Sequence, residues 1–454
     1  MIDFDKLAAY SAAVPRYTSY PTAPEFLDNF SGDDLIRKIE DSNKTNRDIS
    51  LYFHLPFCRS ACYFCGCNVI YTSKEDLKDR YIDYLEKELE ICSRHLNTKR
   101  IISQLHFGGG TPTFFSAVQL QRVIRSIKKT FLNISKNVEF GIEIDPRFFT
   151  PDHMKVFAEN GVNRISFGVQ DFDPKVQEAV HRIQPLDITE KAVEIARANG
   201  IKSINIDLMY GLPCQNIASF EETLRLTLEL EPDRVALFNY AHVPWLKKTM
   251  RKIDETLLPA PSEKLRMLKA AIETFEGAGL EMIGMDHFAK PDDELNIALK
   301  EGRLHRNFQG YTTHGECDLF GFGVTSISEG KDFYLQNIRE NGPYEAKIDQ
   351  GRPPLMRGIE LNKDDLLRKK VIMSLMSNFV LRFKEIEREF DIEFRTHFHD
   401  DLSALKPLEE DGLCAIDNEG ITVGRTGRLL IRNIVMNFDA HLKKNQNRRF
   451  SKSI

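Results

Sequence analysis

The sequence predicts an α/β protein whose core is a parallel sheet of six strand–helix units, curled into a full or partial barrel. Three observations support this prediction. Six short apolar runs alternate with longer amphipathic stretches between residues 50 and 239. The runs lack a strict alternation of apolar and polar residues, as is typical of strands buried on both faces. Polar residues stand where several of the runs end, which is where a barrel carries its reactive groups.

The elements follow an irregular opening that is rich in Pro and Tyr at 15–21. The expected strands are 50–54, 102–107, 139–144, 164–169, 203–208 and 234–239. Amphipathic stretches long enough for crossover helices lie between them, at 74–96, 118–131, 188–199 and 220–230. Gly161 and Gly200 fit helix C-caps, because glycine tolerates the left-handed conformation that ends many helices.

The expected strand ends bring polar side chains to one mouth of the barrel. The first strand runs into a cysteine-rich loop, and the second runs into the glycines 108–110. The next three strands end at acidic or amide side chains, namely Glu143 and Asp145, Gln170 and Asp171, and Asp207. A carboxylate at such a place can also cap a helix, so a binding role and a capping role both stay open.

The pattern changes to helices from about residue 362. Expected helices at 363–377, 382–390 and 398–405 precede two short strands at 413–416 and 420–423 and a final helix at 425–442, an order that resembles a winged helix. Many acids argue against DNA binding, which needs a basic footprint, and favour a lid that closes over a substrate. We therefore divide the chain into an N-terminal covering segment (1–48), a catalytic barrel with its extension (49–360) and a helical C-terminal domain (361–454).

Composition excludes several classes of protein. The chain of 454 residues has 62 basic and 67 acidic residues, a formal charge of -5, which does not suit a generic binder of nucleic acid. No apolar run approaches the length of a membrane span, and residues 1–10 are acidic and mixed rather than a leader sequence. Four of the eight cysteines fall within 58–67, so they form a cluster rather than a disulfide framework. We expect a cytoplasmic protein.

The cysteine loop has the spacing C-x3-C-x2-C, formed by Cys58, Cys62 and Cys65. Three thiolates can hold a [4Fe-4S] cluster and leave one iron with an open position for a small molecule. The alternative is a structural zinc site, which usually has four ligands in two spaced pairs. Cys67 stands two residues farther on, where a packed thiol and a functional thiol are both possible.

This loop after a first barrel strand resembles the signature of the radical S-adenosylmethionine (SAM) superfamily. Further motifs resemble the oxygen-independent coproporphyrinogen III oxidases, and they lie at 15–21, 63–68, 106–113 and 307–313. The resemblance runs from Pro15 to Phe438, nearly the whole chain. It implies a partial six-stranded barrel of radical SAM type.

The resemblance also implies the cofactors and the residues that hold them. Cys58, Cys62 and Cys65 would hold the cluster, and two SAM molecules would share the site. The first SAM would be bound by Tyr52, Gly109, Glu143 and Ile327, with Phe308 and Gln309 nearby. The second would be bound by Phe64, Gly110, Thr111, Gln170, Arg182, Asp207 and Ala241. Arg182 could equally form an ion pair. Tyr52 and Glu143 are also expected among the catalytic residues.

The expected reaction converts the ring A and ring B propionates of coproporphyrinogen III to vinyl groups in haem biosynthesis. One electron from the cluster would cleave SAM to methionine and a 5'-deoxyadenosyl radical, which abstracts a β hydrogen. Substrate propionates need cations, for which Arg16, Arg182 and Arg306 are candidates. Arg16, Tyr17 and Tyr20 would belong to a segment that covers the mouth. An electron donor such as a flavodoxin or ferredoxin is expected as a partner. The chain is expected to be a monomer.

Three alternatives stay open. A related haem chaperone shares the barrel but typically lacks the segment at 15–21, the Gly66–Cys67 pair and the motif at 307–313, and all three are present here. A radical SAM methyltransferase that opens haem would consume haem instead of coproporphyrinogen. A winged-helix regulator with an iron–sulfur sensor would bind DNA in a salt-dependent way and would not cleave SAM.

Overall fold

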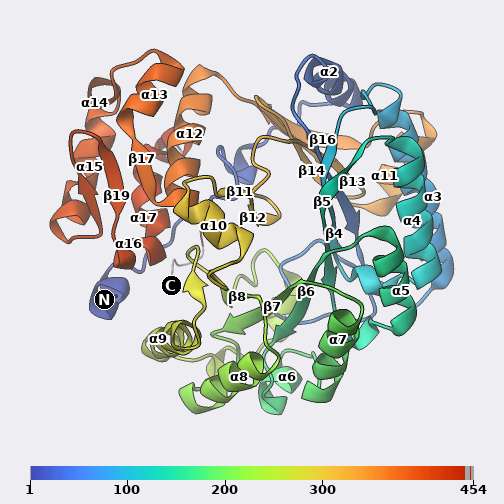
Figure 1. The fold of residues 1–454 in the computed structure, drawn as a ribbon, viewed down its shortest axis with the longest axis horizontal. Helices are drawn as coiled ribbons and strands as arrows, with labels where there is room; N and C mark the ends of the chain where they lie inside the picture. Colours follow the sequence, from blue (N-terminus) through green and yellow to red (C-terminus); the bar gives the residue numbers. More distant parts are fainter. Residues whose placement is uncertain (1, 445–449, 451–454) are drawn as a thin grey trace.

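A computed structural model describes residues 2–444 and 450 of the chain. Its core is a twelve-stranded sheet with the strand order β16-β15-β14-β13-β1-β4-β5-β6-β7-β8-β10-β9. The six central strands are parallel, and the sheet curls so that helices α3, α4, α5, α7 and α8 cover its outer side (Figure 1). The structure thus confirms the predicted parallel sheet of strand–helix units.

All six expected strands form, five of them within about two residues of the expected bounds, whereas the strand expected at 139–144 begins five residues earlier. They are β1 (Ile49–Leu55), β4 (Ile102–Gly109), β5 (Ile134–Ile144), β6 (Arg164–Gln170), β7 (Ser203–Tyr210) and β8 (Arg234–Asn239). Their register sets Tyr52 of β1 opposite His106 of β4, and His106 opposite Gly141 of β5. The predicted site residue Tyr52 therefore starts next to His106 on the neighbouring strand. After β1, the short strands β2 (Phe57–Cys58) and β3 (Ile70–Tyr71) pair in parallel.

The outer helices connect these strands. They are α3 (Glu75–Ser93), α4 (Ala117–Thr130), α5 (Pro151–Asn160), α6 (Pro174–Ala179), α7 (Leu186–Ala198) and α8 (Ile217–Glu229). Gly161 is the C-cap of α5 with φ 87°, as predicted. The C-cap of α7 is Asn199, and Gly200 follows it with φ 83°, so the glycine stands one position later than expected.

Antiparallel strands extend the sheet at both edges, and the sequence pattern did not predict them. β13 (Asp318–Phe322) pairs in parallel with β1, and β14 (Ile327–Glu329), β15 (Phe333–Asn337) and β16 (Leu355–Glu360) continue as antiparallel strands. β10 (His287–Ala289) and β9 (Glu281–Met282) extend the opposite edge. A separate hairpin, β11 (His305–Asn307) and β12 (Gly310–Thr312), reaches toward the concave face (Figure 1). The helices of this region are α9 (Pro261–Gly277), α10 (Glu294–Lys300) and α11 (Asn341–Asp349).

The C-terminal part is mainly helical, as predicted, and carries a small sheet with the order β17-β19-β18. Its elements are α12 (Lys363–Asn378), β17 (Val380–Arg382), α13 (Phe383–Phe390), α14 (Phe394–His397), α15 (His399–Glu410), β18 (Cys414–Ile416) and β19 (Gly420–Val423). The single final helix expected at 425–442 was wrong. It breaks into α16 (Arg425–Leu429), α17 (Ile431–Val435) and α18 (Ala440–Lys444), because Leu430 leaves helical geometry and the buried Asp439 accepts hydrogen bonds from the next turn.

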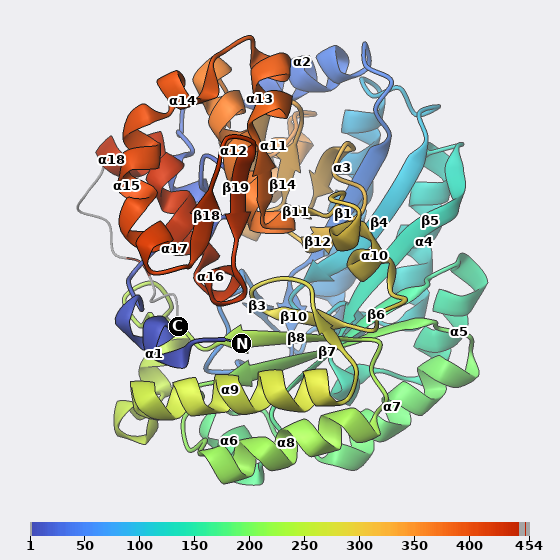
Figure 2. The same ribbon diagram turned by 60° about the vertical axis from the view of Figure 1, so that its left-hand side comes forward.

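The N-terminal segment runs along the C-terminal part. Helix α1 (Phe4–Ala9) contacts α9 and α16 (Figure 2), and α2 (Gly32–Ser42) lies farther along the chain. Tyr17 Oη donates to Asp439 Oδ2 at 2.9 Å, and the Ala440 N–H donates to Tyr20 Oη at 3.1 Å. Among the described residues, no helix has both the length and the apolar character that a membrane crossing requires. The division at residues 48 and 360 stays a prediction.

Candidate active site

Three thiols gather in the loop after β1. Cys58, Cys62 and Cys65 are half-buried and free, and Cys67 is exposed. Each of the three sulfurs has a polar neighbour: Thr111 Oγ1 lies 3.3 Å from Cys58 Sγ, Arg182 Nη1 donates to Cys62 Sγ at 3.6 Å, and the Cys67 N–H donates to Cys65 Sγ at 3.4 Å. Such donors stabilise thiolates, which are the form that binds metals.

The pKa values of two thiols move in opposite directions. Burial raises the pKa of Cys58 to about 12, although the hydrogen bond with Thr111 opposes this effect. The side-chain hydrogen bond with Cys67, supported by the Cys67 N–H, lowers the pKa of Cys65 to about 6, against the effect of burial. A nearby cation or metal ion can compensate the cost of ionising a buried thiol such as Cys58.

Two guanidinium groups stand beside Cys62. Arg147 Nη2 and Arg182 Nη1 both bind Asp145 Oδ2, at 2.7 and 2.9 Å, and both also reach Cys62 Sγ. Arg182 donates in addition to the Gly168 carbonyl at 2.5 Å. Two guanidiniums on one carboxylate leave a net positive charge beside the Cys62 sulfur.

The glycines after β4 are required by close packing. Gly109 has φ 117°, and a Cβ on it would lie 2.8 Å from the His54 ring. A Cβ on Gly110 would lie 2.5 Å from the Pro56 carbonyl oxygen. The Gly109 N–H donates to Glu143 Oε2 at 3.2 Å. The glycines therefore bring the second strand end against both the cysteine loop and Glu143.

Tyr52, His106 and Glu143 form a row on the concave face of the barrel. The Tyr52 and His106 rings stack at 5.9 Å, and His106 Nε2 lies 3.6 Å from Glu143 Oε1. Burial opposes the ionisation of Glu143, but His106 and the Gly109 N–H outweigh it and lower the pKa of Glu143. Glu143 is thus an anion at neutral pH, with its side chain about half exposed to the barrel interior.

Asp207 adds a second carboxylate. Its oxygens accept hydrogen bonds from Ser166 Oγ at 3.1 Å and Asn205 Nδ2 at 2.7 Å. Burial, followed by the negative charge of Glu143, raises the pKa of Asp207 to about 6. A cation bound between two such carboxylates relieves their repulsion, so this wall of the barrel suits a positively charged ligand.

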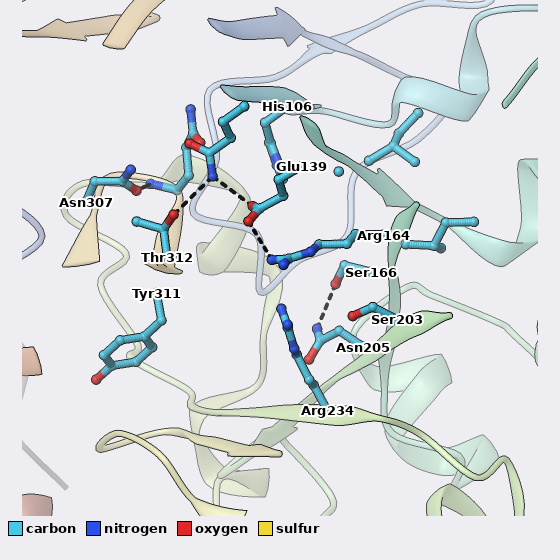
Figure 3. Close-up of a pocket in the computed structure, with 15 residues that line it drawn as sticks. His106, Glu139, Arg164, Ser166, Ser203, Asn205, Arg234, Asn307, Tyr311 and Thr312 are labelled. Atoms are coloured by element: carbon cyan, nitrogen blue, oxygen red, sulfur yellow. Dashed lines mark hydrogen bonds and ion pairs between the residues drawn. The ribbon is translucent and has the colours of Figure 1, made fainter. Parts of the chain in front are cut away.

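A small cavity of about 110 Å³ lies next to His106, and residues of the β11–β12 hairpin, among them Asn307, Tyr311 and Thr312, line one side of it (Figure 3). Glu139 and Arg164 form an ion pair of 2.7 Å on its wall, and Ser166 and Asn205 are joined by a hydrogen bond (Figure 3). Gln309 lines the same cavity, and both polar atoms of its side chain are buried without a hydrogen-bond partner among the described residues. An unsatisfied buried amide indicates a place where a polar ligand or water binds.

The remaining predicted residues lie around this centre in separate groups. Phe308 and Ile327 pack in one apolar cluster with Phe26 and Tyr334. Phe64 packs against a second cluster that includes Tyr240, the residue before Ala241. Gln170 ends β6 with φ 73°. The structure therefore links Tyr52 to Glu143 through His106 and joins Gly109 to Glu143 by a hydrogen bond, whereas Phe308, Ile327 and Phe64 belong to separate apolar clusters.

Comparison with known proteins identifies the family. Residues 52–227 match the radical SAM superfamily, and residues 361–430 match the HemN C-terminal domain. An oxygen-independent coproporphyrinogen III oxidase of Helicobacter pylori is 52% identical over 100% of this chain and 99% of its own. The chain belongs to the oxygen-independent coproporphyrinogen III oxidase family.

Further relatives within this oxidase family agree over almost the full length. The Escherichia coli oxidase is 44% identical over 98% of this chain and 96% of its own. A solved structure of coproporphyrinogen III oxidase from Escherichia coli, described as a radical SAM enzyme, superposes with a TM-score of 0.92 and 44% identity. That match covers 97% of this chain and 99% of the other. The radical SAM fold and the enzymatic class of this chain follow from these relatives.

The superfamily implies a [4Fe-4S] cluster and SAM as cofactors, and the residues present fit both. Half-buried thiols with hydrogen-bond donors suit the cluster, and the anionic wall with its unsatisfied amide suits SAM, which carries a sulfonium and an ammonium. In the described part of the chain, no three His, Cys, Asp or Glu side chains are grouped to hold a single metal ion. The cysteines that hold a cluster of four irons bind different irons, so they stand farther apart than the ligands of a single ion.

Sequence reasoning missed several polar residues of the site. The residues that were not predicted are His106, Arg147, Asp286 and Arg432. His106 lay inside the motif at 106–113 but was not singled out. Arg432 is buried within the apolar run 429–435, and a charged residue inside such a run was a usable signal. Asp286 carried no comparable signal, because it follows a strand of only two residues and its partners come from distant segments.

Proposed function

We propose that this chain catalyses the oxygen-independent oxidative decarboxylation of coproporphyrinogen III to protoporphyrinogen IX, the activity that its relatives are named for. One observation carries the proposal: the match to curated oxidases extends over 98–100% of the chain, including the N-terminal segment and the C-terminal part. Each of two propionates would become a vinyl group, with release of CO2, one hydrogen atom and one electron.

In this proposal, Cys58, Cys62 and Cys65 hold the [4Fe-4S] cluster. Tyr52, Gly109, Glu143 and Ile327 bind the first SAM, beside Phe308 and Gln309, and Phe64, Gly110, Thr111, Gln170, Arg182, Asp207 and Ala241 bind the second. The carboxylates Glu143 and Asp207 support this assignment, because their charges suit the cationic groups of SAM. Arg182 supports it less directly, since its guanidinium is already bound to Asp145 and the Gly168 carbonyl.

The protein's own residues position the reactants and protect the site. The β hydrogen of a propionate is unactivated, so no side-chain base removes it at neutral pH. With the cluster and SAM bound, the site gains a carbon radical able to abstract that hydrogen. Glu143 accepts hydrogen bonds from a ligand ammonium, Asp145 and its two arginines hold the charge beside Cys62, and the C-terminal part (361–454) acts as the lid that excludes water.

The partners follow from the electron balance. Reduction of the cluster requires a one-electron donor, for which a flavodoxin or ferredoxin is suited, and the decarboxylated substrate requires an electron acceptor. We expect a monomer that works in a reducing compartment such as the cytoplasm, because the four clustered cysteines are free.

Anaerobic turnover tests the proposal. The reconstituted protein receives SAM, coproporphyrinogen III, a reductant and a cell extract as electron acceptor, and mass spectrometry quantifies tetrapyrroles and 5'-deoxyadenosine. We expect protoporphyrinogen and about two deoxyadenosines for each molecule formed, and none of either with Cys62→Ala. Unchanged coproporphyrinogen together with stable binding of added haem would contradict the proposal and support the haem chaperone.

A further inference from the structure

Two arginines from distant parts of the chain converge on Asp286. Arg306 stands on β11, and its Nη2 lies 3.7 Å from Asp286 Oδ2. Arg16 belongs to the N-terminal segment and interacts electrostatically with both Asp286 and Arg306. Burial opposes the ionisation of Asp286, but Arg306, His287 and Arg16 lower its pKa well below the ordinary value, so it is an anion.

Both arginines keep unused hydrogen-bonding capacity. Arg306 Nη1 donates to Tyr311 Oη at 3.3 Å, but Arg306 Nε is buried without a hydrogen-bond partner among the described residues. Within residues 2–444 and 450, the Arg16 side chain forms no hydrogen bond and no ion pair within 4.0 Å. A guanidinium has five N–H donors, so most donors of Arg16 remain available to a ligand.

The charge of this group favours an anion. Arg306 pairs with Asp286, and Arg16 interacts with the same carboxylate electrostatically, so these three side chains together carry one positive charge in excess. Arg16 is exposed, and the partial burial of its guanidinium together with the nearby charge of Arg306 lowers its pKa. A third guanidinium, that of Arg432 on α17, lies within electrostatic reach of Arg16 and Arg306. An anion that binds between neighbouring guanidiniums reduces the repulsion between their like charges.

The group lies next to the expected SAM site. The Leu237 N–H of β8 donates to the Asp286 carbonyl at 2.7 Å, so Asp286 lies beside the strand that leads to Ala241. His287 interacts with Asp207, and its Nδ1 lies 2.7 Å from Asp286 Oδ1. Asp207, His287, Asp286 and Arg306 thus form a continuous polar path from the anionic wall to the two arginines.

We propose that Arg16 and Arg306 form a binding site for a carboxylate of the tetrapyrrole substrate, with Asp286 as the residue that positions both guanidiniums. The inference rests on the proposed function, whose substrate carries propionates. Planar guanidiniums match the geometry of carboxylates. Arg16 reaches the site only when the N-terminal segment is docked on the C-terminal part, next to the bond between Tyr17 and Asp439. Substrate binding thereby depends on both ends of the chain.

Binding and kinetics together test this site. Arg16→Gln, Arg306→Gln and Arg306→Lys are compared with Arg303→Gln, an exposed arginine nearby that pairs with Glu301. Fluorescence measures the binding of coproporphyrin III and of its uncharged tetramethyl ester to the reconstituted enzyme, and turnover gives KM for coproporphyrinogen III and for SAM. We expect each Gln variant to raise the tetrapyrrole Kd and KM about tenfold or more, Arg306→Lys to recover part of the loss, and the ester to bind all proteins equally.

The methionyl part of SAM also carries a carboxylate that two arginines could bind. The KM values for coproporphyrinogen III and for SAM show which of the two ligands the arginines bind. A raised KM for SAM with unchanged coproporphyrin binding would overturn the inference, and so would unchanged values for both ligands. Iron content and Tm show whether Arg306→Gln folds, and the more exposed Arg16→Gln provides the test if it does not. If the wild type binds coproporphyrin through these arginines but forms no protoporphyrinogen, the proposed function fails and the site stands.

Discussion

At the scale of single residues, the chemistry depends on how each sulfur is surrounded. Cys58 is half-buried beside Thr111, Cys62 faces two guanidiniums, and Cys65 accepts a backbone hydrogen bond from Cys67. The spacing of the three cysteines was enough to predict them as ligands. Arg182 was predicted as a SAM-binding residue, but the contacts of Arg147 and Arg182 with Cys62 could not be predicted. Arg147 follows β5 and Arg182 follows α6, so the two meet the cysteine loop only in the folded protein.

Exchange of Cys62 for alanine should remove the cluster. Loss of a ligand should lower iron content and activity by more than the roughly 10–100-fold that loss of an outer partner of a metal ligand costs. Cys67→Ala is the comparison, because it removes the Cys67 thiol and its side-chain hydrogen bond with Cys65 but keeps the backbone N–H that contacts Cys65 Sγ. Iron analysis and the visible absorption of the reconstituted proteins measure both. Equal loss of iron in Cys67→Ala would make Cys67 a ligand.

The backbone conformation and close packing of Gly109 do not accommodate a side chain. An alanine there would strain a backbone with φ 117° and would clash with the His54 ring at 2.8 Å. We expect Gly109→Ala to weaken SAM binding, because the Gly109 N–H that holds Glu143 must move. Gly161→Ala is the control, since Gly161 also has a positive φ but no atom lies within 4 Å of its Cβ position. Equilibrium dialysis of SAM compares the two, and equal affinities would contradict the expectation.

At the scale of elements, apolar runs were a sufficient guide where a strand is buried on both faces. β1 and β4 to β8 all lay close to their expected bounds for that reason. β9, β10 and β14 have only two or three residues each, too few for a pattern. A single final helix was predicted because the apolar residues at 425–442 have helical spacing. In the structure, the Asp439 carboxylate instead accepts a hydrogen bond from Tyr17 of the N-terminal segment.

Helix α3 is tied to the loop before β14 by Glu88, which is fully buried. Its carboxylate accepts hydrogen bonds from Tyr344 Oη at 2.6 Å, the Gly323 N–H at 2.7 Å and Asn337 Nδ2 at 2.6 Å. Burial raises the pKa of Glu88 to about 7, above its usual 4.5, despite these bonds. The loop leads to Ile327, so this buried group links the outer helix to the expected SAM site.

Glu88 should make the stability of the protein depend on pH. The folded state keeps a proton that the unfolded state releases between pH 4.5 and about 7, so the free energy of unfolding should fall across this window as pH rises, by about 3 kcal/mol. Glu88→Gln should flatten this slope, and Glu86→Gln on the same helix, whose side chain is partly exposed, should not. Urea unfolding at several pH values measures the slope of the free energy of unfolding against pH. A steep slope that persists in Glu88→Gln would refute the assignment.

At the scale of the whole molecule, the two ends of the chain hold each other in place. The Asp3 N–H donates to Thr426 Oγ1 at 2.9 Å, and Asn433 Nδ2 donates to the Tyr10 carbonyl at 2.9 Å. Sequence motifs placed Tyr17 and Tyr20 in a covering segment, but no pattern could name their partners more than 400 residues away. The covering segment is thus fixed by the C-terminal part.

Tyr17→Phe should loosen this arrangement. Loss of a buried hydrogen bond to a carboxylate should reduce the free energy of unfolding by about 1–3 kcal/mol and should raise the substrate KM, because Arg16 is displaced. Tyr84→Phe removes a hydrogen bond to Asp349 of 3.0 Å at the surface and should cost less than about 0.5 kcal/mol. Thermal unfolding measures the stability of the two variants. Equal loss of stability in Tyr17→Phe and Tyr84→Phe would contradict the docking of the termini.

The most direct test of the central claim follows the hydrogen atom. Coproporphyrinogen III with deuterium at the β carbons of its propionates is turned over anaerobically with SAM, and mass spectrometry reads the deuterium in 5'-deoxyadenosine. If the chain performs radical decarboxylation, each vinyl group formed should deliver one deuterium to one deoxyadenosine. Deoxyadenosine without deuterium, or SAM cleavage without loss of CO2 from the tetrapyrrole, would contradict the account.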